Sequence, residues 1–355
     1  MQTISMFELV LPTFNIDKPI RLIELFAGVG SQAMSLRNIG ANFHSHKISE
    51  WEVNAFKSYK SIHFPDDNTD YSKDYSREKI IEILFDLGIS NDGKQPMTLE
   101  EITRKSEDWQ RETYNNIRAT NNLVNIMKIK GKDLEITDTD KYIYILTYSF
   151  PCQDLSLAGN REGMAKGSGT RSGLLWEVER MLNEVEELPQ VLLMENVPQV
   201  ISQANIADFH KWQQFLESKG YSNYTDTLNA KDYGVAQNRN RTFMVSILGE
   251  YYYKFPKPIP LTKVIADYLE PEVDEKFYIN NEKAQELINQ LVESGQLKKI
   301  EPGNINVVGS LNPQKEVQDR VRVLGVDGIC QGLRATDYKD PAKVCIEEGV
   351  VEIEK

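Results

Sequence analysis

The chain has 355 residues and a net charge of −12, with 40% apolar and 26% charged residues. This length predicts two domains, or one large domain with an appendage, and a core that needs no disulfide or metal to hold it. No apolar run approaches the ~20 residues of a membrane-spanning helix, and residues 1–12 lack the basic start of a signal peptide. Three widely spaced cysteines fit neither a disulfide framework nor a zinc site. We therefore expect a cytoplasmic globular protein that contacts no membrane and holds no metal.

The N-terminal part predicts the start of a doubly wound sheet. Residues 20–26 form an apolar run typical of a buried strand. Residues 27–30 (Ala-Gly-Val-Gly) predict a tight turn, and Ser31 can cap a helix that runs to about Asn38. A second strand is expected over 42–49. Strand, turn, helix and strand in this order predict an α/β fold with a parallel sheet.

A helical insertion is predicted over residues 65–132. One helical pattern covers 76–88. Thr98 and Glu101 have capping-box spacing and start a long, charged helical pattern that runs toward Met127.

Further strands and helices return after the insertion. Strands are expected over 142–148, 191–194 and 242–247, and helices over 174–186 and 209–219. Between them, the glycine-rich segment 159–173 predicts a long mobile loop.

The character of the chain changes after residue 248. Residues 255–260 (Phe-Pro-Lys-Pro-Ile-Pro) predict a linker, followed by one helix over 282–295 and short extended pieces. We therefore place one domain over 1–248 and a smaller region over 249–355.

The glycine turn predicts a cofactor site. Gly28 and Gly30 lie between a strand and a helix N-terminus, where a ligand can approach the backbone. Glu50 follows about 20 residues later, at the end of the second strand, where it can accept from ribose hydroxyls. An adenosine-containing cofactor is predicted, and this pattern alone does not separate a nicotinamide cofactor from S-adenosylmethionine.

Two side chains that could take part in catalysis lie at the ends of predicted strands. Cys152 comes just after the strand at 142–148, where a doubly wound sheet places ligands, although a lone cysteine also serves as a small buried apolar group. Glu195 ends another buried strand, where a carboxylate is costly unless it is paired or active.

A local basic stretch lies within this acidic chain. Residues 229–263 hold six basic and two acidic residues, so they can contact phosphates or form a solvated face. Arg239 and Arg241 are two apart on an extended segment, so both can face one site.

The combination of motifs resembles the DNA cytosine-C5 methyltransferase family. The glycine turn, Pro151-Cys152-Gln153, Glu195-Asn196-Val197 and Gln237-x-Arg239-x-Arg241 occur in the family's order between residues 19 and 247. The resemblance implies a Rossmann-like S-adenosylmethionine-dependent methyltransferase sheet in 1–248 and a target-recognition region in 249–355. It implies methyl transfer from S-adenosylmethionine to C5 of cytosine in double-stranded DNA, through a covalent bond from the cysteine to C6 of a flipped base.

The resemblance also assigns residues. The catalytic residues that it implies are the nucleophile Cys152, the acid Glu195 and the pair Arg239 and Arg241. The cofactor-binding residues that it implies are Phe26, Gly28, Gly30, Glu50, Trp51, Asp133, Pro151 and Leu174. Gln153 and Gln237 are expected to contact the substrate, and no metal is expected.

The family's C-terminal motifs have no counterpart in this sequence. Neither the Pro-Arg-Glu motif nor the terminal Gly-Asn-Ser helix is found, so we expect an incomplete recognition region. The cofactor pocket near 26–31 is then expected to be open on one face, and a second polypeptide to supply the motifs. Three alternatives remain: a transfer RNA cytosine-C5 methyltransferase, a catalytically incomplete DNA-binding fragment, and a nicotinamide oxidoreductase. A bacterial cell or a phage-infected host is the expected setting.

Overall fold

The structure is a computed structural model. The chain forms two compact units. The described residues are 11–152, 155, 163–279, 281–294, 303–312, 322–332, 342–346 and 349–352. The first unit comprises Met1–Asp226 with Thr242–Phe255, and the second comprises Thr227–Arg241 with Pro256–Lys355. The segment with both arginines therefore belongs to the second unit, whereas the sequence-based boundary after residue 248 put it in the first domain.

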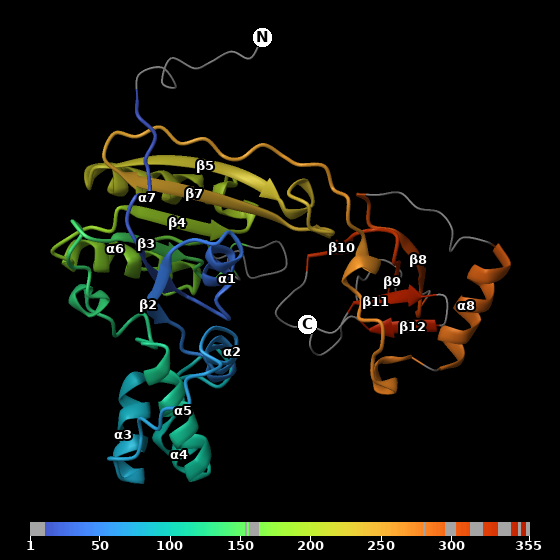
Figure 1. The fold of residues 1–355 in the computed structure, drawn as a ribbon, viewed down its shortest axis with the longest axis horizontal. Helices are drawn as coiled ribbons and strands as arrows, with labels where there is room; N and C mark the ends of the chain where they lie inside the picture. The colour runs from blue at the N-terminus through green and yellow to red at the C-terminus, as the bar shows by residue number, and fades with distance from the viewer. Residues whose placement is uncertain are drawn as a thin grey trace. The chain divides into compact units, whose positions relative to one another are not determined.

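A six-stranded sheet forms the centre of the first unit (Figure 1). Its strands, in spatial order, are β2 (Phe43–Ser49), β1 (Ile20–Leu25), β3 (Ile143–Tyr148), β4 (Val191–Asn196), β7 (Asn240–Leu248) and β5 (Tyr221–Asn229). Pairing is parallel from β2 through β4, and β7 runs antiparallel to β4. The predicted doubly wound α/β sheet is confirmed, while β5 was not predicted.

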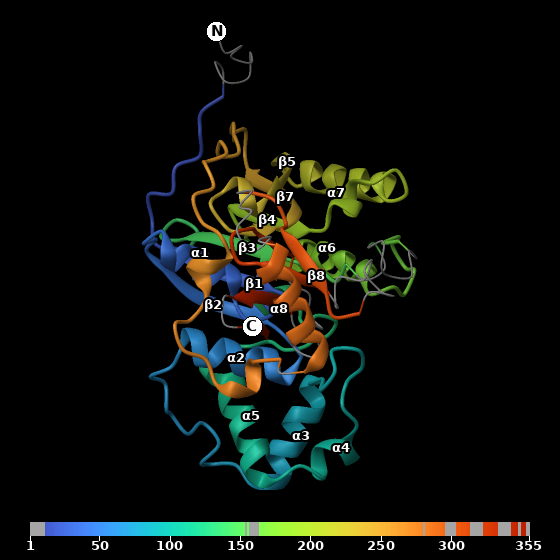
Figure 2. The same cartoon turned by 90° about the vertical axis from the view of Figure 1, so that its right-hand side faces the viewer.

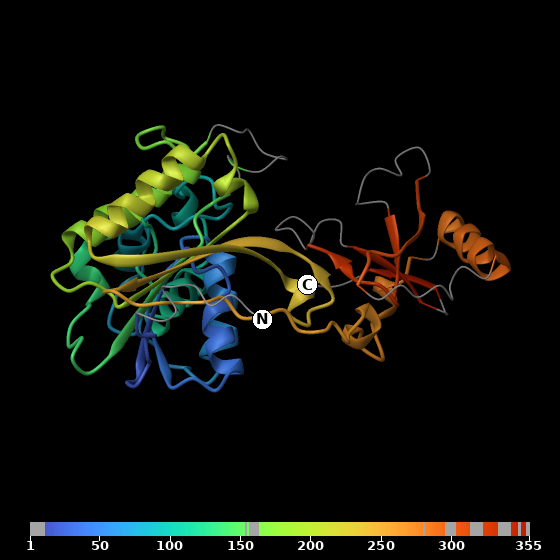
Figure 3. The same cartoon turned by 90° about the horizontal axis from the view of Figure 1, so that it is seen from above.

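Helices cover both faces of this sheet (Figures 2 and 3). On one face lies α1 (Ser31–Asn38), and on the other lie α6 (Leu175–Glu184) and α7 (Ile206–Ser218). Successive side chains of β1 point to opposite faces of the sheet. Leu22 packs in the apolar cluster that includes residues of α1, and Ile23 packs in the cluster that includes residues of α6 and α7. The face that a side chain reaches is thus fixed by its place in the strand.

A buried carboxylate ties the first strand to two helices. Glu24 of β1 is fully buried and accepts from the Tyr59 phenol at 2.6 Å and from the Ala33 N–H at 3.2 Å. Tyr59 belongs to α2 (Val53–His63), which was not predicted. Burial raises the pKa of the Glu24 carboxyl, and the bond from Tyr59 opposes that rise.

The predicted insertion is helical and has its own core. Helices α3 (Arg77–Leu87), α4 (Leu99–Thr103) and α5 (Glu107–Ala119) gather below the sheet in Figure 1 and share one apolar cluster. Thr98 and Glu101 form the predicted capping box, but it caps only the short α4.

The prediction of one long helix that runs toward Met127 is wrong. Ser106 accepts from the Trp109 N–H and so caps a new helix, α5. The left-handed Asn121, with φ 49°, lies just beyond its C-terminal end. The chain consequently leaves the helix at this point, and Val124, with φ 63°, is left-handed as well.

The second unit contains a four-stranded sheet and one helix. The sheet order is β12 (Gly349–Glu352), β11 (Lys343–Ile346), β9 (Arg322–Gly325) and β8 (Val307–Ser310). Helix α8 (Glu282–Ser294) packs Ala284 and Leu291 against Val323 and Cys345 of the sheet. A short parallel pair, β6 (Gln237–Asn238) with β10 (Cys330–Gln331), also belongs to this unit.

Removing the Tyr59 phenol should destabilise the protein in a pH-dependent way. The folded-state pKa of Glu24 is raised, so stability falls as pH rises through that pKa. Tyr59→Phe removes a hydrogen bond that lowers the pKa of Glu24. The variant should therefore lose more unfolding free energy at pH 8 than at pH 5. We expect a loss of about 1–3 kcal/mol at pH 8, measured by urea unfolding.

A matched control is Tyr71→Phe. Tyr71 donates to Asp67, whose pKa is lowered, chiefly by the backbone N–H of Thr69. Since Asp67 is ionised at both pH values, the cost of this variant should be the same at pH 5 and pH 8. Equal pH dependence in the two variants would contradict the role given to Glu24.

Candidate active site

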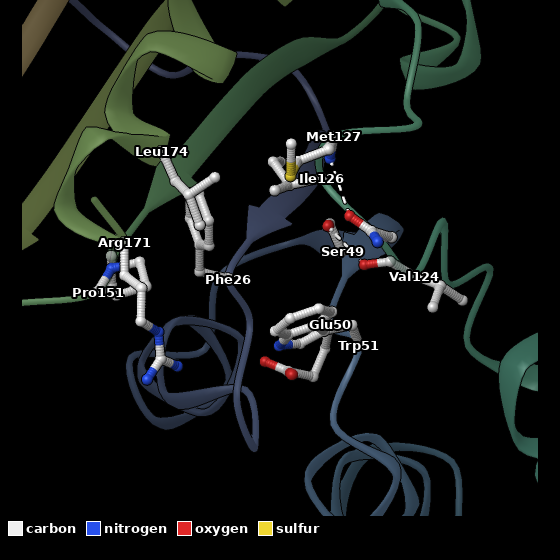
Figure 4. Close-up of a pocket in the computed structure, with 12 residues that line it drawn as sticks. Phe26, Ser49, Glu50, Trp51, Val124, Ile126, Met127, Pro151, Arg171 and Leu174 are labelled. Carbon is white, nitrogen blue, oxygen red and sulfur yellow. Dashed lines mark hydrogen bonds between the residues drawn. The ribbon is translucent and has the colours of Figure 1, made fainter. Parts of the chain in front are cut away.

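A pocket of about 240 Å³ lies at the carboxyl ends of β1, β2 and β3 (Figure 4). It is lined by Phe26, Ser49, Glu50, Trp51, Val124, Asn125, Ile126, Met127, Ser149, Pro151, Arg171 and Leu174. Five of the predicted cofactor residues therefore come together: Phe26, Glu50, Trp51, Pro151 and Leu174. This is the edge at which doubly wound sheets bind ligands.

The glycine turn beside the pocket has a left-handed backbone. Phe26, Gly28 and Gly30 have φ values of 58°, 55° and 84°. A Cβ on Gly30 would lie 2.3 Å from His63 Nε2 and 2.5 Å from Tyr59 Cε2, so Gly30 is required for packing against α2. A Cβ on Gly28 would meet nothing within 4 Å. Gly28 thus leaves open space at the turn, and a bulky Phe26 in this conformation is a strain typical of a functional site.

Glu50 is held by backbone donors. Its Oε2 accepts from the Gly28 N–H at 2.9 Å and its Oε1 from the Glu52 N–H at 2.8 Å. Burial raises the pKa of the Glu50 carboxyl, and these N–H groups oppose the rise. No ion pair to Glu50 occurs among the described residues. Each carboxyl oxygen keeps a lone pair that can accept from a ligand hydroxyl.

Asp133 is not among the pocket residues. It lies in the 3-10 turn Gly131–Leu134, and its Oδ2 accepts from the Lys130 N–H at 2.8 Å. Asn125 lines the pocket instead, with its Oδ1 accepting from the Met127 N–H at 3.1 Å. Sequence reasoning missed Asn125 because it extended a helix through this segment. The consecutive Asn121 and Asn122, which favour a turn, were the available signal.

The strand ends that carry Cys152 and Glu195 are neighbours. Tyr148 of β3 pairs with Met194 of β4, so the residues that follow each lie at one edge of the sheet. The buried Asn196 donates to the Phe150 carbonyl at 3.0 Å and joins the two strand ends. Cys152 and Glu195 are both half-buried there.

The loop after Cys152 is described only from residue 163 onward, apart from residue 155, so Gln153 lies outside the described residues. Its C-terminal part is well anchored, since Ser172 donates to the Pro151 carbonyl at 2.7 Å and Trp176 to the Met164 carbonyl at 2.8 Å. Arg171 lines the pocket and donates to the Gly93 carbonyl in the insertion. This arginine was not predicted as a site residue.

The remaining predicted residues lie in the segment Thr227–Arg241, which ends within the first two residues of β7. Gln237 is in β6, Arg241 is in β7, and Arg239 lies between these strands. The backbone of Arg239 is fixed by bonds between its N–H and Asn229 Oδ1 and between its carbonyl and the Ala230 N–H. Both arginine side chains are half-exposed.

Apolar side chains are exposed beside the glycine turn. Val29 is 48% exposed and Met34 of α1 is 37% exposed.

The described residues contain no helix long and apolar enough to cross a membrane. Nor do they contain a group of three or more histidine, cysteine or acidic side chains arranged to hold a metal ion.

A doubly wound sheet with a pocket at the carboxyl ends of its strands is the arrangement of a cofactor-binding α/β protein. The family model for the C-5 cytosine-specific DNA methylase matches residues 84–327. The orphan methyltransferase M.SssI of Spiroplasma monobiae is 40% identical over 270 residues, which are 75% of this chain and 69% of that protein. The type II methyltransferase M2.ScrFI of Lactococcus lactis subsp. cremoris is 35% identical over 272 residues, or 75% and 72% of the two chains. The chain belongs to the C-5 cytosine-specific DNA methylase family and is a DNA cytosine methyltransferase.

A solved structure, the S. pombe Dnmt2 methyltransferase, aligns with a TM-score of 0.46 and 17% identity. The match covers 79% of this chain and 67% of that one.

The two glycines of the turn should differ in what they tolerate. Both have positive φ, so alanine is strained at either position, but only at Gly30 does a Cβ meet Tyr59 and His63. Gly30→Ala should therefore cost about 1–3 kcal/mol more unfolding free energy than Gly28→Ala, measured by urea unfolding. Equal losses for the two variants would show that the turn does not pack on α2 as described.

Proposed function

We propose that this enzyme transfers a methyl group from S-adenosylmethionine to C5 of cytosine in double-stranded DNA. One observation carries the proposal: Pro151 lines the pocket that contains Glu50, and Cys152 is the next residue. A methyl donor in the pocket and a cytosine bound to the cysteine would then be neighbours. The region 249–355 is proposed to recognise the target sequence, with the domain over 1–248 supplying catalysis.

The pocket residues suit an adenosine-containing cofactor. Trp51 offers an aromatic face for the adenine, and the Glu50 carboxyl can accept from both ribose hydroxyls. Phe26 and Leu174 add apolar walls. We propose that Asn125, rather than Asp133, presents the polar group nearest the adenine, since Asn125 is the one that lines the pocket. When bound, the cofactor supplies an electrophilic methyl group on a sulfonium.

The chemistry requires a nucleophile because C5 of cytosine is too electron-poor to react directly. The Cys152 thiolate is proposed to add to C6, which makes C5 nucleophilic. Glu195 is proposed to hold a proton at N3 as charge develops there. After transfer, a base removes the proton from C5, and the Cys152–C6 bond breaks to release the thiolate.

The DNA contacts are proposed from charge and sequence position. Arg239 and Arg241, within the basic stretch 229–263, are proposed to hold O2 of the cytosine and to support the site. Gln153 and Gln237 are proposed to contact the substrate. The cytosine is proposed to be flipped out of the duplex, at a cost of a few kcal/mol.

A second polypeptide is proposed to cover the face beside the glycine turn. The exposed Val29 and Met34 beside the turn support this, because covering apolar side chains removes them from water.

Replacing the proposed nucleophile should abolish methylation without unfolding the protein. Cys152→Ser should lose covalent trapping on duplex DNA containing 5-fluorocytosine, whose C5 fluorine cannot leave as a proton. With S-adenosylmethionine present, the wild type should be trapped after methyl transfer as an adduct that survives denaturing electrophoresis. Cys330→Ser is the matched control, because Cys330 lies in the second unit beside Gln237, and it should be trapped like the wild type. Covalent trapping of the Cys152→Ser variant would rule out Cys152 as the nucleophile.

Cofactor affinity should depend on the ionisation of Glu50. A carboxylate accepts from ribose hydroxyls more strongly than a protonated acid, so lowering the pH through its raised pKa should weaken S-adenosylmethionine binding. Glu50→Gln should bind about tenfold more weakly at pH 8, and the ratio of the two dissociation constants should shrink toward pH 5.5. Calorimetric titration of both proteins at the two pH values measures this ratio. A ratio that stays constant with pH would contradict the role of the carboxylate.

A further inference from the structure

The end of the helical insertion returns to the sheet beside the pocket. Asn122 forms a parallel bridge with Ile48 of β2, and the Leu123 N–H donates to the Ile48 carbonyl at 2.8 Å. Ser49 of β2 donates its hydroxyl to the Val124 carbonyl at 3.0 Å. Residues 122–124 are therefore bonded to the edge of β2, at the strand end that carries Glu50.

The Asn122 side chain pairs with the peptide group of Glu50. Its Oδ1 accepts from the Glu50 N–H at 3.0 Å, and its Nδ2 donates to the Glu50 carbonyl at 2.8 Å. The same Oδ1 accepts from the Val124 N–H at 2.9 Å. The residue is 6% exposed and does not line the pocket. Asn122 thus fixes the backbone of a pocket residue without facing the pocket itself.

This pairing couples the pocket to the core of the insertion. Val124 is 1% exposed and belongs to the apolar cluster of α3, α4 and α5. Trp51, the residue after Glu50, packs against the same cluster. The backbone that carries Glu50 and Trp51 is therefore held in place by the insertion.

We infer that Asn122 is a positioning residue through which the insertion sets affinity for the cofactor. The inference rests on the proposed role of the pocket. With both Asn122 bonds in place, the Glu50 carboxyl faces the pocket before the cofactor arrives, so binding need not order it. Without them, the Glu50 peptide can rotate and its carboxyl leaves the ribose position for part of the time. Affinity falls, whereas the chemical step on the bound cofactor is unchanged.

The test compares Asn122→Ala with Asn116→Ala. Asn116 is 7% exposed on α5 and lines a separate cavity of the insertion with Lys60 and Asp108, so it is a buried asparagine with no part in the pocket. S-adenosylmethionine is titrated calorimetrically into each full-length protein, and steady-state methylation of duplex DNA is measured. For Asn122→Ala we expect about a tenfold rise in Kd and in KM for S-adenosylmethionine, with kcat within twofold of wild type. Asn116→Ala should match the wild type in all three quantities.

The outcomes separate this inference from the proposed function. If the wild type does not bind S-adenosylmethionine, the proposed function fails. If the wild type binds and Asn122→Ala binds equally well, the positioning role is overturned. A fall in kcat with KM unchanged would also overturn it, because loss of folded protein alone gives that pattern.

A second variant covers the case in which Asn122→Ala does not fold. Asn122→Asp keeps the oxygen that accepts from Glu50 and Val124 but loses the donor to the Glu50 carbonyl. It should bind S-adenosylmethionine more weakly than the wild type, and wild-type affinity in this variant would overturn the inference.

Discussion

The site depends on the half-buried carboxyl group of Glu50, which has no cationic partner among the described residues. Such a group is costly to bury unless hydrogen bonds satisfy it. Its donors come from the glycine turn, through the Gly28 N–H, and from the start of α2, through the Glu52 N–H. Asn122 of the insertion holds its peptide group. Three segments far apart in the sequence are thereby brought together at Glu50, on one side of the pocket.

The buried Glu24 acts in the same way on the other side of the turn. It joins β1 to the N-terminal turn of α1 through the Ala33 N–H and to α2 through Tyr59. Tyr59 also packs closely against Gly30, so α2 holds the left-handed turn in place. The turn therefore has a fixed shape before any ligand binds, as preorganised sites require.

Much of the first unit was predictable from local pattern. The apolar runs of β1, β3 and β4 are buried, and the glycine turn has a specific spacing, so the doubly wound sheet and the position of the pocket could be predicted. Strand β5 was missed because it is an edge strand whose sequence, Tyr-Ser-Asn-Tyr-Thr-Asp-Thr-Leu-Asn, is half-exposed and polar. Helix α2 is similarly polar apart from its buried Val53, Phe56 and Tyr59.

The parts of the site that sequence reasoning missed depend on contacts between distant segments. Asn125 and Asn122 have no local motif, and their roles follow only from the return of the insertion to β2. Asp133 was expected there because Gly131-Lys-Asp133-Leu resembles the family's acidic position, but its carboxylate accepts a local bond from the Lys130 N–H. Arg171 lay within a loop whose glycine content predicted mobility, whereas its contact with Gly93 requires the fold of the insertion.

The most direct test of the account is transfer of a labelled methyl group. The purified protein is incubated with methyl-labelled S-adenosylmethionine and either double-stranded DNA or transfer RNA, and the nucleosides are then separated by mass. The account predicts label in 5-methyl-2′-deoxycytidine from duplex DNA and little in RNA. Label in an N-methylated base, preferential labelling of the RNA, or no label from a folded protein that binds S-adenosylmethionine would contradict it.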